Sequence, residues 1–143
     1  METNSLIIST GLADLPQTAK SLIGEFQHRI ILLEGDLGAG KTTLVKELLV
    51  QLGSTDAGSS PSYSLINEYV TTSESKIYHL DLYRLTSVEE AFALGLEDVL
   101  YSGHYCFVEW PQMIRDYLEP PYHYISIELD EAAHRRIKLS SVS

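Results

Sequence analysis

The chain has 143 residues, of which 44% are hydrophobic and 21% are charged, and its formal net charge is −10. This balance excludes a disordered chain, and the longest apolar runs are too short to span a membrane. The acidic charge repels polyanions and therefore disfavours independent binding to RNA or DNA. We expect one domain over residues 1–143 that binds a protein partner with a basic face, although acidity serving solubility alone is the alternative.

The cysteine content and the N-terminus indicate a cytoplasmic protein. Cys106 is the single cysteine, which excludes an internal disulfide framework and fits a reducing compartment. No basic segment followed by an apolar one is visible at the N-terminus, so no secretory signal is expected. Between Tyr105 and Phe107, Cys106 is interpreted as a buried strand residue without a catalytic role.

The first third of the chain alternates strand and helix patterns. A short strand is predicted at residues 6–8, and apolar residues at helical spacing predict a helix over residues 15–26. Residues 30–33 form a continuous apolar run, typical of a strand buried on both faces. Residues 42–52 return to helical spacing, and Gly53 would end that helix as a C-cap.

The rest of the chain adds shorter elements. Residues 54–62 are rich in Ser, Gly and Pro, which predicts a loop. A capping box that begins at Ser87 predicts a helix running towards Leu94, with Gly95 near the end of that helix. Five strands are predicted, at residues 63–70, 76–83 and 105–108 and in a closing hairpin of 124–129 with 136–139. Residues 110–118 are predicted to be partly helical. Alternation of this kind predicts an α/β fold, with a sheet covered by helices and antiparallel additions.

The stretch GDLGAGKTT (residues 35–43) lies between the predicted buried strand and the next helix. It matches the Walker A pattern, in which glycines let backbone N–H groups surround phosphates at a helix N-terminus. Lys41 would reach the β- and γ-phosphates, and the Thr42 hydroxyl would ligate Mg²⁺. The sequence therefore predicts a P-loop NTPase-like domain with a mixed, mostly parallel sheet. ATP and Mg²⁺ are the expected cofactors, and the expected binding residues are Gly35, Asp36, Leu37, Gly38, Ala39, Gly40, Lys41, Thr42 and Thr43.

A second carboxylate at a strand end is needed to hold the metal, directly or through water. Two candidates follow apolar strands, Asp81 in YHLDLYR and Glu109 in YCFVEWP. Glu109 ends a short buried strand, whereas Asp81 shares the polar face of an alternating strand with His79. That polar face is typical of a working site, although a solvent-facing strand edge would look the same.

Nothing in the sequence stands out as an arginine finger or a water-positioning glutamine, so spontaneous hydrolysis is expected to be slow. Slow hydrolysis in a small acidic domain indicates a switch or an accessory subunit. A small-molecule kinase and a non-hydrolysing, nucleotide-gated scaffold are the alternatives, although a kinase would need a lid and an acceptor pocket for which little chain remains.

Four segments in this order and spacing resemble the bacterial TsaE (YjeE) family: GDLGAGKTT, SPSY (60–63), HLDLYR (79–84) and VEWP (108–111). The resemblance implies a weak ATPase required for threonylcarbamoyladenosine formation on the adenosine beside the tRNA anticodon. It implies partnership with the TsaD–TsaB heterodimer, which performs the carbamoyl transfer, while the ATP cycle resets the complex. The tRNA would be contacted only through that complex, and no membrane is involved.

The resemblance also implies roles for individual residues. Lys41, Asp81 and Glu109 would be catalytic, and Thr42 with Glu109 would hold Mg²⁺. Residues 60–62 would act as a switch segment, in which this chain has Ser62 where the family usually has Thr. Trp110 would contact the nucleotide or partner, or else pack in the core. Apart from these motifs, we expect adenine between the N-terminal segment after Ile8 and the C-terminal strands near Arg135.

Overall fold

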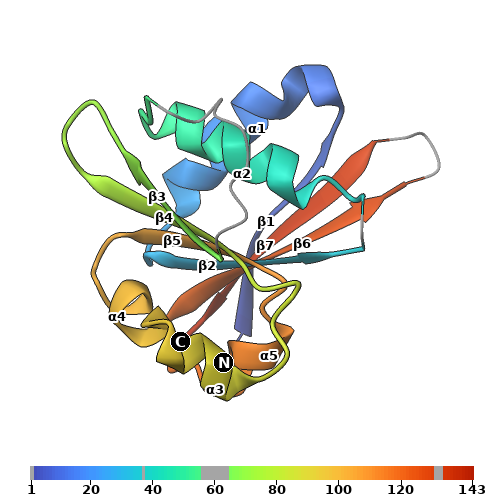
Figure 1. The fold of residues 1–143 in the computed structure, drawn as a ribbon. Coiled ribbons are helices and arrows are strands. Elements are labelled where there is room, and N and C mark those ends of the chain that lie inside the picture. Colours follow the sequence, from blue (N-terminus) through green and yellow to red (C-terminus); the bar gives the residue numbers. More distant parts are fainter. Residues whose placement is uncertain (1, 37, 56–64, 131–133) are drawn as a thin grey trace.

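The computed structural model describes residues 2–36, 38–55, 65–130 and 134–143. Its strands form one seven-stranded mixed sheet in the order β1-β7-β6-β2-β5-β4-β3 (Figure 1). The strands are β1 Glu2–Thr10, β2 Ile30–Gly35, β3 Ile66–Val70, β4 Lys76–Asp81, β5 Tyr105–Glu109, β6 Tyr122–Leu129 and β7 Arg135–Val142. The helices are η1 Leu12–Asp14, α1 Leu15–Glu25, α2 Lys41–Gln51, α3 Val88–Ala93, α4 Leu96–Leu100 and α5 Gln112–Arg115.

The centre of the sheet is parallel and its flanks are antiparallel. Strands β6, β2, β5 and β4 pair in parallel, while β1–β7, β7–β6 and β4–β3 are antiparallel pairs. The predicted α/β class, mixed sheet and antiparallel additions are confirmed. The parallel centre has a functional consequence, because the carboxyl ends of β2, β4 and β5 lie at the same edge of the sheet.

Helices cover both faces of the sheet, α1 and α2 on one and α3, α4 and α5 on the other (Figure 1). Side chains of β2 alternate between the two cores, as the uninterrupted apolar run requires. Ile31 and Leu33 pack in the cluster with α1 and α2, while Ile30 and Leu32 pack in the cluster with α3, α4 and α5. Burial on both faces explains why this strand has no polar alternation.

The predicted boundaries hold best where a cap or a turn marks them. The Ser87 hydroxyl accepts a hydrogen bond from the Glu90 N–H at 3.2 Å, which confirms the predicted start of α3. Gly95, with φ 83°, ends the α3 region and is also the N-cap of α4, which the sequence analysis did not predict. Residues 56–62 of the predicted loop and residues 63–64 of the predicted strand lie outside the described residues.

Some strand bounds differ in extent: β7 covers Arg135–Val142 where residues 136–139 were predicted, and β4 ends at Asp81 and not at residue 83. β1 is longer than the predicted residues 6–8, because it pairs with β7 along its length. Gln112–Arg115 is α-helical, which agrees with the partly helical stretch predicted at residues 110–118. In the described part of the chain, no helix is both long and apolar enough to cross a bilayer.

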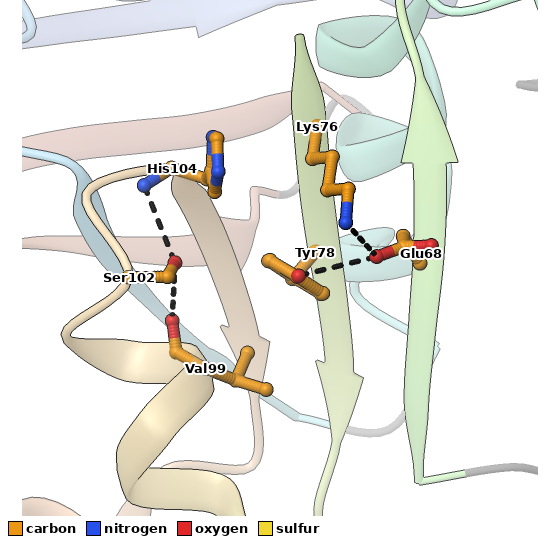
Figure 2. A network of polar contacts seen from close by, with 6 residues as sticks. All are labelled: Glu68, Lys76, Tyr78, Val99, Ser102 and His104. Carbon is orange, nitrogen blue, oxygen red and sulfur yellow. Dashed lines mark hydrogen bonds and ion pairs between the residues drawn. The ribbon is translucent and has the colours of Figure 1, made fainter.

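Polar contacts fix the β3–β4 edge and the entry to β5 (Figure 2). Glu68 on β3 accepts a hydrogen bond from the Tyr78 hydroxyl at 3.1 Å and forms an ion pair with Lys76 at 3.4 Å. Ser102 donates to the Val99 carbonyl at 2.7 Å after α4. With β4 and β5 in parallel register, Asp81 and Glu109 are Cα partners at the carboxyl edge.

Candidate nucleotide site

The turn between β2 and α2 carries the glycines from which the sequence predicts a phosphate-binding loop. Gly38 and Gly40 have φ angles of 83° and 103°, in the left-handed region that favours glycine. Gly40 is the N-cap of α2, and no side chain at this position accepts a hydrogen bond from the first N–H groups of the helix. These N–H groups and the positive end of the helix dipole are therefore available to an anion.

The loop is also held closely against neighbouring strands. A Cβ on Gly35 would lie 2.7 Å from the Ile127 carbonyl oxygen, and a Cβ on Gly40 would collide with the Arg135 side chain. The Arg135 Nε donates to the Ala39 carbonyl at 2.9 Å, so the first residue of β7 fixes the loop. The structure thus brings Arg135 to the glycine-rich loop, whereas its predicted place near adenine stays a prediction.

Lys41 is enclosed at the base of this loop. Lys41 is only 5% exposed. Its ammonium group donates a hydrogen bond to the Gly35 carbonyl and lies 3.5 Å from the centroid of the Trp110 ring. Burial lowers the pKa of Lys41 from its ordinary value, while the charges of Glu109 and Asp81 oppose that shift. The site therefore joins one buried cation to a group of carboxylates.

Glu109 connects the first turn of α2 to the adjacent strand β4. It is only 2% exposed at the end of β5, and its Oε1 accepts a hydrogen bond from the Thr42 hydroxyl at 2.9 Å. Its Oε2 is in direct hydrogen-bond contact with His79 Nε2 on β4. Two side chains therefore fix the orientation of this carboxylate, one from α2 and one from the neighbouring strand.

Asp81 lies at the same sheet edge but remains exposed. It is the Cα partner of Glu109, and its Oδ1 accepts a hydrogen bond from the Tyr83 N–H at 3.1 Å. Trp110 has φ 56°, a sparsely populated conformation for a residue other than glycine, and its ring lies 4.9 Å from that of Tyr83. Trp110 is thus placed between Tyr83 and the Lys41 ammonium group, at the candidate site and not deep in a core.

Most of the remaining predicted residues lie on the same loop. Asp36 is exposed and its carbonyl accepts from the Ala39 N–H at 2.9 Å, and Thr43 is exposed on the first turn of α2. Leu37 and the predicted switch residues 60–62 lie outside the described residues. His79 was not among the predicted site residues, and its shared strand face with Asp81 was the signal that could have identified it.

The donor set fits Mg²⁺. This ion prefers oxygen ligands and is commonly held by one or two carboxylates together with waters and substrate phosphates. The Thr42 hydroxyl and the Glu109 carboxylate are adjacent oxygen donors beside the helix N-terminus. Nucleotide phosphates at the loop would complete such a ligand set without further protein groups.

A family model described as "Threonylcarbamoyl adenosine biosynthesis protein TsaE" matches residues 10–137. The chain belongs to the TsaE family. A TsaE from Rickettsia felis, named a tRNA threonylcarbamoyladenosine biosynthesis protein, is 43% identical over 104 residues, which are 71% of this chain and 60% of the relative. A TsaE of the same name from Bacillus subtilis is 39% identical over 62% of this chain and 54% of the relative. The matched region thus spans little more than half the length of these relatives.

A solved structure supports the fold over the whole chain. The crystal structure of YdiB from Bacillus subtilis is similar, with a TM-score of 0.75 and 27% sequence identity. The similarity covers 100% of this chain and 88% of YdiB. The architecture of this TsaE family member is therefore that of a known protein structure.

Proposed function

We propose that this chain is an ATP-binding, slowly hydrolysing accessory subunit required for threonylcarbamoyladenosine formation in tRNA. Membership of the TsaE family supports the pathway. The observation that carries the ATPase assignment is the Thr42–Glu109 hydrogen bond, because it joins a Walker A hydroxyl to a buried strand-end carboxylate. That pair is the arrangement a metal-dependent phosphoryl-transfer site requires.

The residues of the proposed site have separate roles in binding the phosphates, holding the metal and orienting water. The N–H groups at the start of α2 and the Lys41 ammonium group would bind the phosphates, while Thr42 and Glu109 would hold Mg²⁺. The ion, when bound, would neutralise charge on the transferring phosphoryl group. His79 keeps Glu109 oriented, and Asp81, exposed beside it, would orient water near the site.

Hydrolysis by the chain alone should be slow. The Arg135 guanidinium group donates a hydrogen bond to the Ala39 carbonyl, and that of Arg115 lies 3.7 Å from a Glu34 carboxylate oxygen. These two guanidinium groups are therefore already engaged with protein atoms. A cationic group that stabilises the transition state typically raises phosphoryl-transfer rates by about 10³–10⁵-fold. A partner that supplies or releases such a group would therefore stimulate turnover strongly.

The proposed partner is the TsaD–TsaB heterodimer in the cytoplasm, with tRNA contacted through the complex. The net charge of −10 disfavours direct binding to a polyanion and favours a protein surface with basic residues. In this proposal the chemistry on tRNA belongs to the heterodimer, and ATP hydrolysis resets the complex between turnovers.

Steady-state release of phosphate from ATP, measured with and without purified TsaD–TsaB, tests this proposal. We expect weak turnover alone, stimulation by the heterodimer, and loss of both in Lys41→Ala and Glu109→Gln. Lys46→Ala, an exposed lysine on α2, is the matched control and should retain wild-type turnover. Unchanged turnover in Glu109→Gln, or transfer of phosphate to a metabolite, would refute the proposal.

A further inference from the structure

A shallow apolar groove lies among α3, α4 and α5. These three helices cover the sheet face opposite α1 and α2 (Figure 1). Aromatic and aliphatic side chains from all three helices and from the segment after α5 line it. These residues, with one carboxylate, are Phe92, Glu97, Leu100, Tyr101, Ile114, Tyr117 and Leu118. We call this surface the α3–α5 groove.

The aromatic residues of the α3–α5 groove are unusually accessible. Phe92 is 40% exposed, Tyr101 50% and Tyr117 60%. The rings of Phe92 and Tyr117 meet edge-on with centroids 6.1 Å apart, so they form one continuous surface. Single exposed apolar residues are common, whereas clustered ones around a groove mark interaction sites.

The rim of the groove is acidic. Glu97 is part of the lining, and the Glu119 N–H donates to the Tyr101 hydroxyl at 3.3 Å, which places Glu119 at the edge. Arg115 is the only Lys or Arg between residues 87 and 119. Its guanidinium group lies 4.2 Å from the centroid of the Tyr124 ring and also contacts Glu34, so it does not neutralise the rim.

Charge determines what can occupy the groove. A second copy of this chain would also carry a net charge of −10, and nucleic acids and anionic lipid surfaces would be repelled as well. We propose that the α3–α5 groove binds a basic amphipathic segment of a protein partner. Apolar side chains of that segment would pack on the surface that Phe92 and Tyr117 form together, and its Lys or Arg residues would face Glu97 and Glu119.

The walls of the groove are connected directly to the candidate site. α3 follows Asp81 after residues 82–87, and α5 follows Glu109 after Trp110 and Pro111. α5 is also held to the end of β2, since Gln112 Nε2 donates to Glu34 at 3.0 Å. A partner segment in the groove would contact α3 and α5, which follow Asp81 and Glu109 in the chain. The α3–α5 groove is therefore the surface through which a partner would stimulate ATP hydrolysis.

This inference rests on the proposed function, and binding of the chain to immobilised TsaD–TsaB tests both separately. Tyr117→Ser and Phe92→Ser should each weaken affinity by about tenfold or more, as expected for buried aromatic contacts. The double variant Glu97→Lys/Glu119→Lys should slow association and reduce its salt dependence. Val50→Ser, a change of an exposed apolar residue on α2, is the control and should bind like wild type.

Turnover of ATP without partner supplies the second readout. The groove variants should hydrolyse ATP at the wild-type basal rate but lose stimulation by the heterodimer. If wild type binds and the groove variants bind equally well, the groove is not the docking site, although the proposed function stands. If wild type neither binds nor is stimulated, both the partnership and the groove assignment are overturned.

Discussion

Replacing His79 with alanine removes one of the two side chains that hold the Glu109 carboxylate. His79 Nε2 contacts one carboxylate oxygen, while the Thr42 hydroxyl donates to the other at 2.9 Å. Glu109 is buried, so water does not readily replace the lost partner. The carboxylate would then be free to rotate about the Thr42 bond, and we expect slower ATP hydrolysis.

The size of the effect follows from this single contact. A hydrogen bond to a charged group contributes about 1.5–3 kcal/mol. At about 1.4 kcal/mol for each factor of ten, its loss would lower turnover by about 10- to 100-fold if the carboxylate position limits catalysis. Because the Thr42 hydrogen bond remains, we expect a value near the lower end. His79→Gln retains an N–H donor and should recover part of the rate.

The assay separates positioning from nucleotide binding. Turnover number, KM for ATP and the Mg²⁺ concentration for half-maximal rate would be measured for both His79 variants. We expect a lower turnover number and a higher Mg²⁺ requirement, with metal-free nucleotide affinity unchanged, because His79 lies outside the proposed phosphate-binding loop. His104→Ala, on the loop before β5, is the matched control. Wild-type turnover and Mg²⁺ requirement in His79→Ala would refute the positioning role.

Three further predictions follow from single contacts. Gly40→Ala should destabilise the fold by roughly 1–2 kcal/mol in urea unfolding and abolish nucleotide binding, because alanine disfavours this left-handed backbone and its Cβ would displace Arg135. The free energy of unfolding should fall as the pH drops below 6.5. Burial lowers the pKa of His123 from that ordinary value, so the unfolded chain takes up a proton on this ring before the folded chain does. In the same urea melts, His123→Gln should show a weaker pH dependence. Burial raises the pKa of the Cys106 thiol to about 12, so a thiol reagent at pH 8 should label the unfolded chain and spare the folded one.

Each of these predictions has a contrary outcome. Wild-type nucleotide affinity in Gly40→Ala would show that the loop tolerates a side chain there. His123 donates or accepts through both ring nitrogens, with Nε2 accepting from the Gln27 N–H at 2.8 Å and Nδ1 3.2 Å from the Ser140 carbonyl. Equal pH dependence in wild type and variant would show that this neutral ring is not the titrating group. Rapid labelling of folded Cys106 would show that β5 opens readily.

Sequence patterns located the glycine-rich turn between β2 and α2 because the residues that specify it are adjacent in the chain. The apolar run of β2, the glycines and the start of α2 are contiguous, so a local pattern identifies them. Arg135 and Ile127, far along the chain, then hold the loop in place. The cap at Ser87 is equally local, since its partner is Glu90. Such features need no knowledge of strand order.

The contacts missed by the sequence analysis depend on distant pairings. His79 meets Glu109 only because β4 lies beside β5 in parallel register, which no local pattern specifies. The first residues of β1 lack an apolar alternation, and their strand conformation depends on pairing with β7. α4 has only five residues, too few to show helical periodicity. The candidate site was therefore predictable as a set of motifs, and its internal hydrogen bonds were not.

The most direct test of the central claim is the threonylcarbamoyladenosine content of tRNA in cells that depend on this chain. Nucleosides from digested tRNA would be quantified by mass spectrometry after the native gene is replaced by wild type, Lys41→Ala or Glu109→Gln. The proposed function predicts normal modification with wild type and with the exposed-lysine control Lys46→Ala, and its loss with both site variants at equal protein levels. Normal modification with Lys41→Ala would contradict the claim that nucleotide turnover at this P-loop drives the pathway.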